Sequence, residues 1–173
     1  MTLRDLAYDS TQVQRRFTLG VSLAGMVLAT ICAGLANVDW ASWQWAIVLF
    51  VAFDLIGGVA AMTMPPAIRK LRPPDEPLRP VLFAAFHVHP FVIYLALPEI
   101  EIETMAVLYG FAVAGVAALN LLPVRQHRSA LALAWCVGAL SILALLDGSF
   151  GLEWLAPAYM LKLTGSHSVP TAE

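Results

Sequence analysis

The sequence predicts an all-α integral membrane protein, and three observations support that fold class. Of the 173 residues, 60% are hydrophobic and 13% are charged, whereas soluble domains have about half apolar and about a quarter charged residues. Five stretches come close to the roughly 20 apolar residues that cross a bilayer. The Lys and Arg residues fall in alternate links between those stretches, as in multi-pass proteins. A chain of this size has no core large enough to hide so much apolar surface, so we expect the lipid bilayer to surround it.

We expect a bundle of five transmembrane helices, separated by polar or proline-containing links. The predicted spans cover residues 17–36, 43–64, 80–98, 104–122 and 129–147. A sixth segment, 150–164, has only eight uncharged residues between Glu153 and Lys162, which is about 12 Å of helix. It is too short to span unaided, and three interpretations stay open: a short tilted sixth helix, a re-entrant segment, or a segment in the membrane interface.

The distribution of basic residues predicts that the N-terminus is cytoplasmic. Nine of the ten Lys and Arg residues precede the first span, lie between spans two and three, or lie between spans four and five. Short links that contain Lys and Arg stay in the cytoplasm during insertion. The expected organisation is therefore a cytoplasmic N-terminal segment 1–16, a transmembrane bundle 17–164 and a polar C-terminal tail 165–173.

The N-terminus and the overall composition indicate the membrane in question. The first apolar run begins only at Phe17, after a polar stretch with three arginines, which is typical of an uncleaved anchor rather than a signal peptide. Ala-rich spans and eight arginines against two lysines suit a bacterial inner membrane. We therefore expect a multi-pass protein of the cell inner membrane.

Asp54 is the most unusual residue of the second span. It lies eleven residues from both Trp43 and Pro65, near the middle of the span. An aspartate at a helix centre costs about 2.5 to 3.5 kcal/mol on insertion scales, and such residues usually face the bundle interior and mark a function. Gly57 and Gly58 share its helix face, which predicts close packing against another helix. The structural alternative is a protonated carboxyl group that only holds two helices together.

Two histidines occupy the middle of the third span. Spans two and three are consecutive and antiparallel, so His87 and His89 fall at nearly the depth of Asp54. The two positions are about 200° apart around a helix, so a regular helix cannot direct both side chains to one point. A single intramembrane histidine is commonly an interhelical hydrogen-bonding residue. Two histidines opposite an acid favour a functional layer.

Three further residues bear on this layer. Pro90 removes a backbone N–H and clashes with the carbonyl of Phe86, so we expect a kink that leaves the Phe86 carbonyl free. Tyr94 lies one turn beyond the proline and could add a hydroxyl group. Lys162 could pair with Asp54 if the last segment enters the bundle, since a buried acid is usually tolerated beside a buried base. If that segment lies on the surface, Lys162 is a solvated charge.

The same residues limit the cofactors and partners that we expect. His87, His89 and Asp54 are a ligand set that a divalent metal accepts, although His-x-His alone is a weak metal signal. Haem is disfavoured, because bis-histidine ligation needs a second span with a histidine. Nucleic acid is not an expected partner, because the basic residues form no continuous patch. The expected partners are the bilayer and a small or lipid-soluble ligand.

The sequence is compatible with three functions. The leading hypothesis is an intramembrane site that binds or acts on a small or lipid-soluble molecule, with Asp54, His87 and His89 as proton-handling or metal-holding groups and with weaker roles for Tyr94 and Lys162. The first alternative is a proton-linked transporter or channel. The second is an accessory or structural membrane subunit without chemistry of its own. Neither an enzymatic reaction nor an oligomeric state can be assigned from the sequence.

Overall fold

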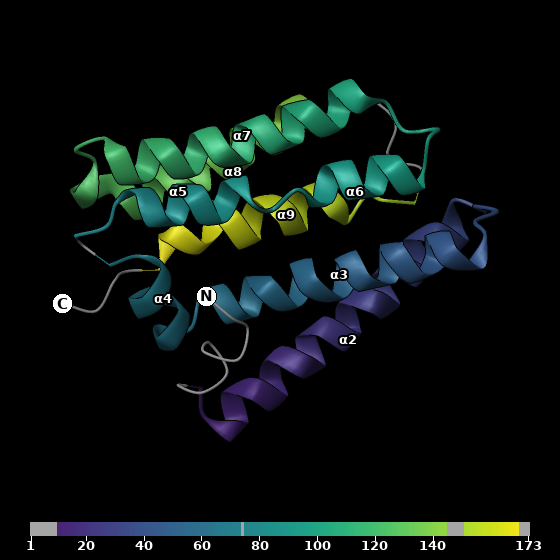
Figure 1. Ribbon diagram of the computed structural model, residues 1–173, viewed down its shortest axis with the longest axis horizontal. Coiled ribbons are helices and arrows are strands. Elements are labelled where there is room, and N and C mark those ends of the chain that lie inside the picture. Colours follow the sequence, from purple (N-terminus) through teal and green to yellow (C-terminus); the bar gives the residue numbers. More distant parts are fainter. Residues whose placement is uncertain (1–9, 74, 145–150, 170–173) are drawn as a thin grey trace.

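In a computed structural model of the protein, residues 10–73, 75–144 and 151–169 are described, and these residues form helices and short links without a strand (Figure 1). The helices are α2 (Gln12–Leu35), α3 (Ser42–Met62), α4 (Pro65–Leu71), α5 (Leu78–Ala85), α6 (His89–Ala96), α7 (Ile102–Leu121), α8 (Arg128–Leu143) and α9 (Leu155–Leu163), with two 3-10 turns, η1 (Arg125–His127) and η2 (Gly165–Ser168). The all-helical fold class predicted from the sequence is confirmed over the described residues.

Within the described residues, four helices are long and apolar enough to cross a membrane, whereas five spans were predicted. They are α2, α3, the combined segment Leu78–Ala96 and α7. The predicted fifth span, 129–147, corresponds to α8, which has 16 residues and falls short of the roughly 20 that a bilayer requires. The end of that prediction, from residue 145, lies outside the described residues. The count of five spans is therefore not confirmed.

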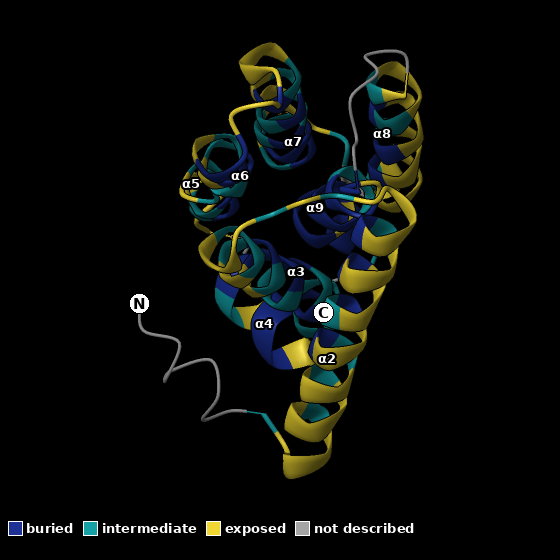
Figure 2. Cartoon of the chain, turned by 90° about the vertical axis from the view of Figure 1, so that its right-hand side faces the viewer, coloured by how far each residue is buried: buried dark blue, intermediate teal, exposed yellow. Residues whose placement is uncertain are grey.

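The short C-terminal helix α9 lies in the interior of the bundle. It packs against α3, α7 and α8, and Figure 2 shows its buried surface enclosed between these helices. Leu155, Tyr159, Met160 and Leu163 are each almost completely buried. Residues 151–164 therefore contribute to the packed interior, and the three interpretations of how this segment relates to the membrane stay predictions. Residue 150 of that segment lies outside the described residues.

Small side chains allow α2 and α3 to approach closely. The buried face of α2 consists of Ser22, Gly25, Ala29 and Ala33. A Cβ atom built on Gly57 of α3 would lie 1.7 Å from the Ser22 hydroxyl oxygen, so only glycine fits there. The small face predicted beside Asp54 is thus a packing surface, as backbones approach most closely where side chains are smallest.

The predicted third span is broken into two helices. α5 ends at Ala85 and α6 begins at His89, and the three residues between them, 86–88, are not helical. The two halves run nearly in line (Figure 1). Pro90 occupies the first turn of α6, where its missing N–H has no intrahelical role. The proline therefore begins a new helix instead of kinking a continuous one.

Two links differ from the expected polar loops. α4 turns the chain between α3 and α5, and its residues Pro66, Ala67, Ile68 and Leu71 are buried. The first part of the predicted polar tail 165–173 folds as η2 against α8, and Gly165, Ser166 and His167 are buried. The last four residues of that prediction lie outside the described residues. Both links add packed structure at one end of the bundle.

Candidate functional site

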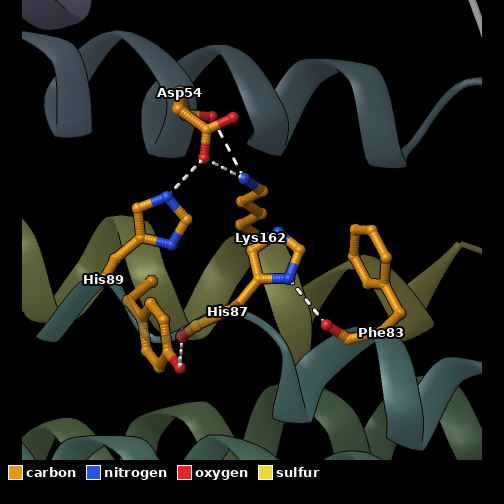
Figure 3. A network of polar contacts seen from close by, with 6 residues as sticks. Asp54, Phe83, His87, His89 and Lys162 are labelled. Carbon is orange, nitrogen blue, oxygen red and sulfur yellow. Dashed lines mark hydrogen bonds and ion pairs between the residues drawn. The ribbon is translucent and has the colours of Figure 1, made fainter. Parts of the chain in front are cut away.

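Asp54 is the centre of a polar cluster formed by three helices (Figure 3). One carboxylate oxygen, Oδ2, lies 3.0 Å from Nε2 of His89 on α6. The same oxygen forms an ion pair with the ammonium group of Lys162 on α9. The Lys162 Nζ atom also lies 3.4 Å from the backbone carbonyl oxygen of Asp54. The predicted pairing of Lys162 with Asp54, which required α9 to enter the bundle, is present in the structure.

The three side chains are buried to different degrees. The Lys162 side chain is 4% exposed and that of Asp54 is 36% exposed, while the His89 side chain is 19% exposed. A charge that is withdrawn from water needs a partner of opposite sign. Lys162 depends more strongly on Asp54 than Asp54 depends on Lys162, because the carboxylate is the more exposed group and has a second donor in His89.

Hydrogen bonds define the state of each imidazole ring. Nδ1 of His87 lies 2.7 Å from the Phe83 carbonyl oxygen, which only accepts, so Nδ1 carries a hydrogen and Nε2 of the neutral ring has a lone pair. His89 donates from Nε2 to the carboxylate of Asp54, which leaves Nδ1 as the acceptor nitrogen of the neutral ring. Nδ1 of His89 is buried and has no hydrogen-bond partner within the described chain. The ring centroids are 5.4 Å apart.

Tyrosines from two other helices bind the backbone at the break in the third span. The Tyr109 hydroxyl of α7 donates to the Ala85 carbonyl at 2.8 Å, and the Tyr159 hydroxyl of α9 donates to the His87 carbonyl at 2.6 Å. These donors satisfy carbonyls that a continuous helix would satisfy internally. The prediction of a free Phe86 carbonyl is wrong, because the Phe86 oxygen accepts from the Val88 amide within the break.

The break also brings the two histidines onto one side of the chain. His87 precedes α6 and His89 is its first residue, so the angle of about 200° that separates such positions in a regular helix does not apply. Both rings thereby lie in the region of Asp54 and Lys162 (Figure 3). Tyr94, which was expected to contribute a hydroxyl group, forms no hydrogen bond with these side chains in the structure. Tyr159 takes a place beside the cluster instead.

Tyr159 was not identified from the sequence, although one signal was available. It lies three residues before Lys162, so the two side chains share a face of α9. Once Lys162 is placed in the bundle, its helical neighbours become candidates for the same site. A hydroxyl group in an apolar segment has to find a hydrogen-bond partner when it is buried.

The geometry gives no support to a metal site. Within the described residues, no group of three or more His, Cys, Asp or Glu side chains is arranged to hold a metal ion. Oδ2 of Asp54 is shared by an imidazole N–H and an ammonium group. A divalent cation would have to displace both donors to reach that oxygen. The lone pairs that the hydrogen bonds leave, on Nε2 of His87 and on the buried Nδ1 of His89, lie on separate rings.

An apolar groove of about 700 Å³ lies between α2, α3 and α9, away from this cluster. Its lining includes Phe17, Ile56, Trp154 and Leu161, and none of the four clustered side chains belongs to it. The groove is therefore a separate feature from the polar site.

The cluster combines a carboxylate, an ammonium group and two imidazole rings, and this set can accept hydrogen bonds and exchange protons. A proton received at Nδ1 of His89 would create an imidazolium ion already bound to the Asp54 carboxylate. Comparison of the chain with protein-family models, with curated proteins and with solved structures finds no match.

Proposed function

We propose that the protein is a multi-pass membrane protein in which His87 and His89, supported by Asp54, bind a small lipid-soluble molecule through a hydroxyl or similar donor group and exchange a proton with it. The observation on which the proposal rests is the buried Nδ1 of His89, which has no partner within the described chain. Leaving a buried polar atom without a hydrogen bond costs about 1–3 kcal/mol. A network that only joins helices would be expected to avoid that cost.

The electrostatics of the cluster favour proton exchange at His89. Asp54 and Lys162 form a pair of opposite charges, and the imidazole of His89 contacts the same carboxylate oxygen. A proton transferred from the ligand to Nδ1 would be stabilised by the carboxylate at Nε2. The arrangement is that of a base oriented by an acid, which is common in acid–base sites. The positive charge of Lys162 favours the ionised form of the Asp54 carboxyl group, which can then stabilise a protonated His89.

A pair of matched probes tests the binding site. A long-chain alkylphenol should raise the melting temperature of the purified protein more than the alkylbenzene of the same chain length, because only the phenol can donate a hydrogen bond to Nδ1 of His89. The difference between the probes should disappear in His89→Ala. It should persist in Tyr94→Phe, which removes a hydroxyl outside the cluster. Equal responses to both probes in the unmodified protein would refute the proposal.

Proton-linked transport is the second candidate, and the tautomers of the two rings favour it. Nε2 of His87 and Nδ1 of His89 both have lone pairs, on rings 5.4 Å apart, so protons could pass between them through one bridging water or ligand. Reconstituted liposomes with an internal pH dye separate the two functions. Proton uptake without added phenol that is lost in His89→Ala would favour transport.

We also propose that the N-terminus faces the cytoplasm of a bacterial inner membrane. The start of α2, α4, the start of α5 and the start of α8 lie at one end of the bundle (Figure 1), and these segments contain most of the basic residues. Lys and Arg are retained on the cytoplasmic side. We call this the arginine end of the bundle.

Cysteine labelling in a background without Cys32 and Cys136 tests the orientation. Arg69 at the arginine end and Glu101 at the opposite end are both exposed, so cysteines there should react freely. Arg72 is unsuitable as a labelling position because its side chain is buried. In intact cells, an impermeant maleimide should modify position 101 and leave position 69 unmodified. The reverse pattern would invert the topology.

A further inference from the structure

A second polar cluster lies at the arginine end, where four elements meet. Arg72 follows α4, Asn120 lies in the last turn of α7, Arg128 begins α8 and His167 belongs to η2. An exposed ion pair between Arg79 and Glu76 lies at the same end of the bundle. The cluster shares no residue with the Asp54 site.

Arg72 has an unused donor in a buried position. The residue is 5% exposed, and its Nη1 donates to the Val169 carbonyl at 3.1 Å. The other terminal nitrogen, Nη2, is buried and has no hydrogen-bond partner in the part of the chain that the structure describes. Burial, followed by the positive charge of Arg128, lowers the pKa of Arg72 to about 10. The guanidinium nevertheless remains charged at neutral pH.

His167 lies close to Arg72, and both of its ring nitrogens form hydrogen bonds. Its Nδ1 lies 3.0 Å from the Leu163 carbonyl oxygen, and its Nε2 accepts from the Asn120 amide at 3.0 Å. Burial, and then the charge of Arg72, lowers the pKa of His167 to about 4. The ring is therefore neutral at pH 7 and contributes no charge. The two arginines dominate the local potential.

We propose that Arg72 and Arg128 form a binding site for a phosphate group, supplied by the headgroup of an anionic phospholipid. The free Nη2 of Arg72 provides a donor, and the planar guanidinium is suited to two oxygens of one phosphate. Arg128 is the first residue of α8, so it lies at the positive end of that helix's dipole, where an anion is favoured. The inference depends on insertion of the bundle in a membrane, but not on a ligand at His89.

The position of the cluster favours a lipid over a free anion. Asn120 lies in the last turn of the candidate span α7, and Arg72 follows α4, which connects the candidate span α3 to α5. In an inserted bundle, this end would lie near the headgroup phosphates of one leaflet. Basic pockets between helices on the cytoplasmic side are known to bind anionic headgroups. A free phosphate ion has the same oxygens but no acyl chains. A lipid would gain further contacts, because its acyl chains could pack against the apolar surfaces of α7 and α8.

Lipid titrations of the purified full-length protein in detergent test the site. Phosphatidylglycerol should raise the melting temperature, and phosphatidylcholine with the same acyl chains should have a smaller effect because its headgroup has no net charge. Arg72→Gln should raise the phosphatidylglycerol concentration at half-effect by at least about tenfold, since it removes charge-assisted hydrogen bonds. The half-effect concentration for Arg72→Lys should lie between those of the unmodified protein and of Arg72→Gln. Arg69→Gln is the matched control on exposed α4 surface and should leave the response unchanged.

Each remaining outcome decides the question. If Arg72→Gln fails to fold, Arg128→Gln provides the same comparison and should weaken the response to phosphatidylglycerol. Stabilisation by inorganic phosphate at similar concentrations would retain the anion site and overturn the lipid as its source. Equal responses of the Arg72 and Arg69 variants, or equal effects of the two lipids, would overturn the site itself. His89→Ala should respond to lipid normally, so failure here is distinguishable from failure of the His89 proposal.

Discussion

Asp54→Asn is expected to lower the free energy of unfolding by about 3 kcal/mol, the lower end of the range for breaking a buried ion pair. The variant leaves the Lys162 ammonium, which is 4% exposed, without its carboxylate. The lower end applies because the Asp54 side chain is 36% exposed and water screens part of the interaction. Asparagine keeps a side-chain oxygen that can accept from His89, so the decrease in stability measures mainly the loss of the Asp54 charge.

Lys162→Met should lower the free energy of unfolding by about 1 kcal/mol, which is less than the effect of Asp54→Asn. The remaining carboxylate is partly exposed and still accepts a hydrogen bond from His89. The double variant should recover most of the loss caused by Asp54→Asn, since neither charge is then stranded. Reversible unfolding in mixed detergent micelles measures all three, with the exposed Glu99→Gln as the control for loss of one negative charge. Additive losses in the double variant would show that the two groups do not interact.

Gly58→Leu is expected to destabilise the protein by about 3 kcal/mol or more, whereas Gly110→Leu should have little effect. A Cβ atom at Gly58 would lie 2.5 Å from Cε of Lys162, and nothing lies within 4 Å of a Cβ atom at Gly110. Both glycines lie in apolar helices, so they differ in packing rather than in helix propensity. The Lys162 side chain is flexible, and a larger residue at Gly58 would displace it from Asp54.

Thermal unfolding in detergent compares the two glycine variants directly. Gly58→Ala adds a milder test, because its single methyl group should shift Lys162 without disrupting the backbone. We expect that variant to fold and to show a reduced coupling energy between Asp54 and Lys162 in the double-mutant cycle. Indistinguishable losses for leucine at the two glycines would contradict the close approach of α9 to α3.

The sequence predicted the polar layer better than it predicted the helices that form it. Asp54 and His89 meet because their spans are antiparallel and both residues lie near mid-span, which follows from counting residues. Hydropathy and charge likewise predicted the four long apolar segments. These properties depend on one segment at a time, or on neighbours in sequence, and can be derived without tertiary structure.

The features that the sequence did not predict depend on contacts between distant segments. The nine-residue helix α9 is too short for its sequence to place it in the interior, and Lys162 is accommodated there in an ion pair with Asp54. Pro90 permitted either a kink or a break, and the hydroxyl groups of Tyr109 and Tyr159 make the break acceptable by binding its carbonyls. The predicted span 129–147 extends past Leu143, where α8 ends, because the apolar sequence continues to Leu146.

The broken third span has a consequence for biosynthesis. Segment 78–96 is synthesised before Tyr109 and well before Tyr159, so the nascent chain lacks the donors that bind the Ala85 and His87 carbonyls. In a membrane those carbonyls can be satisfied early only within a continuous helix, because hydrocarbon offers no alternative partner. The segment would therefore enter the bilayer as one helix and open at residues 86–88 after α9 has docked. The His89 site would then be the last part of the protein to mature, and a ribosome-bound chain that ends before α9 should lack it.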